Sequence, residues 1–342
     1  MFRGGARRVT VVSTAIGTRI SICWLSALLA IAIFIVVINA SSSSKHTSSS
    51  SSSGKTRTSS FLRSSTGSIS MSSANALVPP PMLYGTAWKK DATEEMVKEA
   101  IRNGFRWFDT ACQPKHYNEK GLGDGIAGGG VDRKDLFIQT KFTPLRGQDP
   151  KSVPYDSTRS LTEQVRQSLE RSLENLRTTY IDSMLIHSPL DTLEDTMTAY
   201  HELEVLVQEK KVLYIGMSNL YDIEMLRQIY SNAVVKPSFI QNRFYRDSGY
   251  DVDIRKFCRN NGMHYQSFWT LSANPHILRS AGVRSISSRL GKTPEQVFFA
   301  FVRSQGIIFL TGTKDSKHMA EDLDVPNITL SEDDVSTIAD ML

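Results

Sequence analysis

Four side chains that could act together on a proton stand close behind short apolar runs of this sequence. Asp109 lies at the end of RWFDT, Lys141 ends LFIQTK, His187 ends IDSMLIH, and Tyr117 follows Asp109 by eight residues. A phenol can donate a proton, and a neighbouring ammonium lowers the pKa of a phenol by favouring the phenolate. A carboxylate can neutralise a buried ammonium, and a neutral imidazole can donate a hydrogen bond to a substrate oxygen. This set therefore predicts a site that protonates a substrate oxygen.

Each of these residues alone also fits a structural role. An aspartate can cap a loop, and a lysine can extend its ammonium to solvent. His116 is an alternative proton donor beside Tyr117, but pairing with Lys141 suits a phenol better. Cys112 lies near the same residues, where a lone cysteine is more often a small buried hydrophobe than a redox group.

The elements that position these residues alternate between strands and helices. The strand-like runs are 82–87, 106–110, 136–141, 181–187, 212–218, 238–241, 264–269 and 306–310. Helix-like segments, with apolar residues three and four apart, lie at 93–104, 161–176, 193–211, 223–233, 252–262, 293–306 and 331–342. Eight such units over residues 76–342 predict a (β/α)8 TIM barrel, for which about 250 residues is typical. No G-x-G-x-x-G follows the first strand, which argues against an open doubly wound sheet.

In such a barrel the chemistry gathers at the carboxyl ends of the strands. Ser218, Asn219 and Gln241 also end apolar runs, so they are expected on the same rim as the four ionisable residues. Convergence of ionisable and polar groups on one rim is typical of a functional site.

Six motifs carry a resemblance to a known family. They are FDTACQPKHYNEKGLG, FIQTKF, LIHSPL, IGMSN, QNRFY and TGTKDSKHMAEDL. Over about residues 79–330 the chain resembles the aldo-keto reductase superfamily. The resemblance implies a catalytic tetrad of Asp109, Tyr117, Lys141 and His187. It implies nicotinamide cofactor contacts from Gly85, Thr86, Ser218, Asn219, Gln241 and Phe268, and adenosine-phosphate contacts from Thr313, His318, Glu321 and Asp322. Trp88, His187 and Trp269 are the expected substrate contacts, and no metal is expected.

The chain departs from the family pattern in three places. The segment between Asp109 and Tyr117 is longer than usual, so a longer loop must bring the phenol to the rim. Gly312 and His318 stand where NADP-binding members usually carry Lys and Arg, and with lysines nearby the pattern favours NADPH over NADH. Little chain follows the last helix-like segment, so the loop at 146–156 is the expected wall of the substrate pocket.

A separate leader precedes the barrel. Residues 1–19 are basic, residues 20–38 carry no charge over a length that suits a bilayer, and residues 39–75 are Ser-rich. We expect a single-pass transmembrane or signal helix followed by a disordered linker. The barrel would then sit at a membrane, or in an organelle or secretory lumen if the leader is cleaved.

Charge and cysteine content exclude other classes. The chain has 342 residues and a net charge of +5, but eight basic residues precede residue 76, which leaves the remainder mildly acidic. A mildly acidic body does not support nucleic-acid binding. Three scattered cysteines do not form a disulfide framework or a zinc cluster.

The expected function is therefore reduction of aldehydes or ketones by a nicotinamide-dependent barrel enzyme. One alternative is a catalytically weak cofactor-binding barrel that serves as a redox sensor or partner subunit. Another is a dehydrogenase that runs the same site in the oxidising direction.

Overall fold

A computed structural model describes residues 80–342 of the chain. The predicted basic segment 1–19, membrane or signal helix 20–38 and Ser-rich linker 39–75 lie outside the described residues. Within residues 80–342, no helix combines the length and apolar character that are needed to cross a bilayer.

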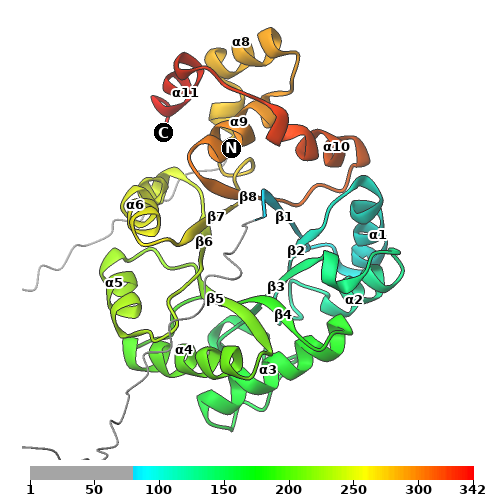
Figure 1. The fold of residues 1–342 in the computed structure, drawn as a ribbon, viewed down its shortest axis with the longest axis vertical. Helices are drawn as coiled ribbons and strands as arrows, with labels where there is room; N and C mark the ends of the chain where they lie inside the picture. Colours follow the sequence, from blue (N-terminus) through cyan, green and yellow to red (C-terminus); the bar gives the residue numbers. More distant parts are fainter. Residues whose placement is uncertain (1–79) are drawn as a thin grey trace, which may run out of the picture. The chain divides into compact units, whose positions relative to one another are not determined.

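Eight parallel strands form a closed barrel in which each strand pairs with the next in sequence and β8 pairs with β1. The strands are β1 (Met82–Gly85), β2 (Trp107–Asp109), β3 (Phe137–Phe142), β4 (Ile181–Ile186), β5 (Val212–Ser218), β6 (Phe239–Arg243), β7 (His264–Phe268) and β8 (Ile307–Thr311). Figure 1 shows these strands at the centre with helices around them. The predicted (β/α)8 barrel is confirmed for this part of the chain.

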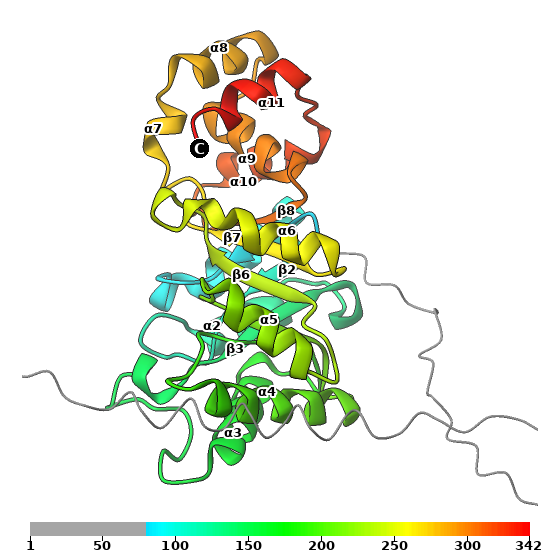
Figure 2. The same ribbon diagram turned by 90° about the vertical axis from the view of Figure 1, so that its left-hand side faces the viewer.

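The helices are α1 (Thr93–Asn103), α2 (Glu119–Ala127), α3 (Leu161–Leu176), α4 (Leu193–Gln208), α5 (Ile223–Asn232), α6 (Val252–Asn260), α7 (Pro275–Leu278), α8 (Ala281–Leu290), α9 (Pro294–Ser304), α10 (Ser316–Asp324) and α11 (Glu332–Ala339). Helices α1 to α6 follow the first strands, whereas α7 to α11 gather beside β7 and β8 (Figure 2). Helices α2, α7, α8 and α10 are absent from the helix-like segments predicted from apolar periodicity.

Glycines explain why α2 was missed. Its sequence, EKGLGDGIA, has three glycines, which disfavour an isolated helix. Here they allow close packing, because a Cβ on Gly123 would lie 2.1 Å from the carbonyl oxygen of Asn175 in α3. The side chain of Asn118 caps the helix by accepting a hydrogen bond from the amide of Gly121.

The barrel has two separate apolar clusters. The larger one fills the space between the strands and the helices. The smaller one is Leu83, Leu185, Phe239 and Ile308, whose side chains project from the strands into the barrel. Side chains two residues further along a strand point to the same side, so the interior above this cluster is reached by residues such as Gln241 and Arg243.

Candidate active site

A cavity of about 760 Å³ opens at the carboxyl ends of the strands. It extends from Asp109, Tyr117 and His187 to helix α10. All the predicted site residues line it except Lys141 and Thr86.

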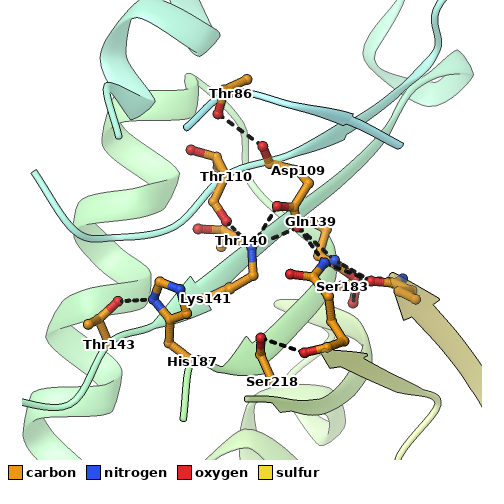
Figure 3. A network of polar contacts seen from close by, with 12 residues as sticks. Thr86, Asp109, Thr110, Gln139, Thr140, Lys141, Thr143, Ser183, His187 and Ser218 are labelled. Carbon is orange, nitrogen blue, oxygen red and sulfur yellow. Dashed lines mark hydrogen bonds and ion pairs between the residues drawn. The ribbon is translucent and has the colours of Figure 1, made fainter. Parts of the chain in front are cut away.

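Lys141 lies directly beneath this cavity, in contact with Asp109. Its Nζ lies 2.7 and 2.8 Å from the two carboxylate oxygens of Asp109 and donates to the carbonyl oxygen of Thr110 at 2.8 Å (Figure 3). The side chains are 1% and 4% exposed, respectively. The Asp109 carboxylate also accepts from Nε2 of Gln139 at 2.8 Å and from Nε2 of Gln241 at 3.0 Å. The ion pair is therefore held in one geometry at the floor of the cavity.

Tyr117 reaches this floor despite the longer loop before it. Its ring centre lies 5.9 Å from that of His187 in an edge-on arrangement, and the Nζ of Lys141 lies 5.6 Å from the centre of the Tyr117 ring. The structure thus brings all four residues of the expected tetrad together.

The expectation that Lys141 lowers the pKa of Tyr117 is wrong for this structure. Burial raises the pKa of the phenol, and the negative charge of Asp109 raises it further. The ammonium of Lys141 directs its hydrogen bonds to Asp109 and Thr110 instead. Tyr117 is therefore a protonated phenol, which is the form a proton donor needs.

The loop that carries Tyr117 is fastened on two sides. The amide of Trp88 donates to the carbonyl of His116 at 2.8 Å, and the two aromatic rings lie 3.9 Å apart. On the other side, Nε2 of Gln113 donates to the carbonyl of Gly147 at 2.6 Å. These contacts hold the extra residues of the loop in a turn that delivers the phenol to the rim.

The loop at 146–156 does not wall the cavity as predicted. No residue of this segment lies on the cavity surface. Gly147 and Gln148 instead bind the loop that carries Tyr117 from behind, through Gln113 and the carbonyl oxygen of Cys112. Phe268 at the end of β7 and the residues that follow it, through Ser272, line the cavity instead.

His187 is held as a neutral ring. Its Nδ1 lies 2.7 Å from Oγ1 of Thr143, which leaves Nε2 on the opposite side of the ring. Burial lowers its pKa to about 3, with further contributions from the charges of Lys141 and His116. A neutral imidazole whose Nδ1 accepts from Thr143 carries its proton on Nε2, where it can donate to a substrate oxygen.

Two exposed tryptophans flank the mouth of the cavity. Trp88 is 55% exposed and Trp269 is 50% exposed. Both have left-handed backbones, with φ of 63° and 56°. A bulky residue in that region is strained, and such strain is concentrated at functional sites.

The residues expected to bind the nicotinamide sit at the ends of β5, β6 and β7. Oγ of Ser218 donates to the carbonyl of Gln241 at 2.8 Å, and Nδ2 of Asn219 donates to the carbonyl of His187 at 2.8 Å. Phe268 lies across from Arg243 in the β6–β7 register, and Gly85 lines the cavity at the end of β1. Thr86 is fully buried behind the wall and bonds the carbonyl oxygen of Asp109.

The opposite end of the cavity is formed by β8, α9 and α10. Thr313, His318, Glu321 and Asp322 line it as expected. Asp322 accepts from Oγ1 of Thr311 at 2.6 Å, and burial raises the pKa of its carboxyl to about 6.

Sequence reasoning missed some lining residues, among them Arg243, Thr293, Glu295 and Phe299. Arg243 could have been found, because it lies two residues after Gln241 and so faces the same side of β6. The α9 residues carry no such signal, since their place depends on how the helix docks. Across residues 80–342, no three His, Cys, Asp or Glu side chains gather as metal ligands do.

Known proteins match most of this chain. The model of the Aldo/keto reductase family matches residues 82–342. Glyoxal reductase of Bacillus subtilis (strain 168) is 30% identical over 249 residues, which cover 72% of this chain and 82% of that protein. Methylglyoxal reductase DkgB of Escherichia coli O157:H7 is 27% identical over 263 residues, with 73% and 88% covered.

Solved structures also resemble this chain. MGS-M4, an aldo-keto reductase enzyme from a Medee basin deep-sea metagenome library, aligns with a TM-score of 0.66 over 77% of this chain and 91% of that chain. Its identity is 24%, so this likeness bears on the fold alone.

Proposed function

This chain belongs to the aldo/keto reductase family of oxidoreductases, and we propose that it reduces small aldehydes or ketones to alcohols with NAD(P)H as cofactor. The observation that carries the proposal is the meeting of Asp109, Tyr117, Lys141 and His187 at the floor of one cavity. The relatives named for glyoxal and methylglyoxal support dicarbonyls as the first substrates to test.

We propose that this cavity holds the nicotinamide dinucleotide. At one end, Ser218, Asn219 and Gln241 present hydroxyl and amide groups close to Asp109. Two residues beyond Gln241 on β6, Nε of Arg243 is buried with no hydrogen-bond partner. A buried polar atom of this kind calls for a partner from outside the chain. When bound, the cofactor supplies hydride to the carbonyl carbon.

The protein's own part is to hold the carbonyl oxygen and protonate it. Nε2–H of His187 would orient the oxygen, and the phenol of Tyr117 would give it a proton as negative charge develops. Lys141 and Asp109 fix the floor beneath the phenol, where the Nζ of Lys141 lies 5.6 Å from the centre of the Tyr117 ring. Trp88 and Trp269 are the proposed apolar walls for the substrate.

We further propose a preference for NADPH. Lys317 and His318 line the end of the cavity where an adenosine phosphate would lie. A lysine ammonium can bind a phosphate as a point charge, although it lacks the two-pronged geometry of arginine. Lys317 also lies 3.6 Å from Glu321, so the phosphate must compete with that carboxylate.

Turnover of the full chain tests the proposal. Loss of NADPH and NADH absorbance would be followed with glyoxal, methylglyoxal and simple aldehydes. Reduction that is faster with NADPH than with NADH supports both the proposed reductase activity and the proposed cofactor preference. Tight cofactor binding without reduction would instead indicate the sensor or partner-subunit role, and alcohol oxidation exceeding carbonyl reduction would indicate a dehydrogenase.

The leader is proposed to hold the barrel at a membrane, on the sequence of residues 20–38 alone. Partition of the full chain into the membrane fraction, resistant to alkaline carbonate, is the expected result. A mature N-terminus near Ser41 would show cleavage instead, and would favour an organelle or secretory lumen.

A further inference from the structure

Arg243 is a cationic side chain of the cavity with no anionic partner in the described chain. It ends β6 and lines the cavity. Among the ion pairs of residues 80–342, none includes Arg243. Its Nε is buried and has no hydrogen-bond partner. A half-buried guanidinium without a partner lacks the hydrogen bonds that it could donate to water or to an anion.

Aromatic rings hold this guanidinium in place. Its central carbon lies 4.1 Å from the ring centre of Trp269 and 5.1 Å from that of Tyr245. Stacking on an aromatic face occupies the flat side of a guanidinium and leaves the edge with its N–H groups free. The backbone amide of Arg243 is fixed as well, since it donates to the hydroxyl of Tyr221 at 3.1 Å. The donor edge is therefore preorganised.

The position of Arg243 places it above the expected nicotinamide site. Its side chain is two residues beyond Gln241 on β6 and points to the same side of the strand. On the neighbouring strand β7, the residue that pairs with Arg243 is Phe268. An anion bound here would lie beside the residues proposed to hold the nicotinamide.

The acidic residues of the cavity are occupied elsewhere. Asp109 pairs with Lys141, Glu321 lies beside Lys317, and Asp322 accepts from Thr311. The negative charge of Glu295 helps to raise the pKa of Asp322, which places Glu295 at the end of the cavity that α10 forms. No carboxylate of the lining residues is thus placed to satisfy Arg243.

We propose that Arg243 binds an oxyanion of a molecule that occupies the cavity. Two sources share this chemistry: the diphosphate of the cofactor and a carboxylate on the carbonyl substrate. A guanidinium edge pairs with either group through parallel N–H···O hydrogen bonds. The inference deepens the proposed function and rests on the cavity being the reductase site.

Binding constants distinguish the two sources without requiring turnover. Calorimetry on the full chain would measure the Kd of NADPH, and then the Kd values of succinic semialdehyde and butanal on the complex with NADP⁺. These two aldehydes have the same chain length and differ in the carboxylate. The variants are Arg243→Met, Arg243→Lys and Arg246→Met; Arg246 is an exposed arginine outside the cavity lining and controls for the lost charge.

If the diphosphate is the partner, Arg243→Met weakens NADPH binding by about tenfold to a hundredfold, as loss of a charged hydrogen-bonded contact does. If the carboxylate is the partner, only succinic semialdehyde weakens by such a factor, and butanal does not change. Arg246→Met should match wild type in both cases. Unchanged constants for all three ligands in Arg243→Met would overturn the inference.

Arg243→Lys keeps the charge but loses the paired donors, so its affinity should fall between wild type and Arg243→Met. If Arg243→Met does not fold, Arg243→Lys tests the same inference. Absence of turnover in the wild type, with NADPH bound and weakened by Arg243→Met, would refute the proposed function and leave this inference standing.

Discussion

Replacement of Asp109 by asparagine tests how the floor of the cavity is held together. The change keeps the shape of the side chain and removes its charge, so Lys141 keeps its 1% exposure but loses its counter-ion. It also places an amide NH₂ or oxygen where three donors converge, from Lys141, Gln139 and Gln241. Removing one partner of a buried ion pair costs about 3–5 kcal/mol of unfolding free energy.

The pH dependence of this loss has a definite sign. Burial already lowers the pKa of Lys141, and Asp109 opposes that shift. Without Asp109 the folded-state pKa falls further below the unfolded value of about 10.4. The unfolded state then binds more protons than the folded state, so the stability of Asp109→Asn should rise as the pH increases toward that value.

Urea unfolding of the full chain, followed by tryptophan fluorescence at neutral and alkaline pH, measures both effects. Adding Lys141→Met to Asp109→Asn should recover most of the lost stability, since it removes the unpaired charge. Asp132→Asn is the matched control, because its pair with Lys134 has both side chains 75% exposed and should contribute about 0–1 kcal/mol. A loss below about 1 kcal/mol for Asp109→Asn, or no recovery in the double variant, would refute this reasoning.

Two further predictions concern α2 and His187. Gly123→Ala should lower the thermal midpoint by several degrees, which corresponds to a loss of at least about 1–3 kcal/mol in unfolding free energy. The reason is that the new Cβ would lie 2.1 Å from the carbonyl oxygen of Asn175. An unchanged midpoint would mean that α2 and α3 are not packed this closely. The pH profile of kcat/KM should show no step from His187 between about pH 5 and pH 8, because its pKa is about 3, and a step that disappears in His187→Gln would contradict a neutral ring.

The sequence was most informative where a residue's position on a strand determines its role. The ends of β2, β3, β4 and β5 could be placed to within one residue from apolar runs alone, whereas β6 runs two residues further than predicted, to Arg243. The barrel rule then brought Asp109, Lys141 and His187 to one rim. Closed pairing of β8 with β1 leaves little freedom in where these side chains lie.

Features that depend on contacts distant in sequence were not predictable. Helix α2 forms because its glycines allow close approach of α3, whereas propensity alone disfavours it. The raised pKa of Tyr117 depends on its burial and on the negative charge of Asp109. Likewise, the loop at 146–156 could be identified as near the site, but its role as a rear support depends on Gln113 and Gln148.

The central claim is that the Tyr117 phenol protonates the carbonyl oxygen, and the kcat of Tyr117→Phe tests it most directly. The hydroxyl is removed while the ring stays between His187 and Lys141. The predicted result is a loss of kcat by about 10²- to 10⁴-fold with the Kd of NADPH unchanged. Retention of kcat in Tyr117→Phe, with loss in His116→Ala, would contradict the claim and assign the proton to His116.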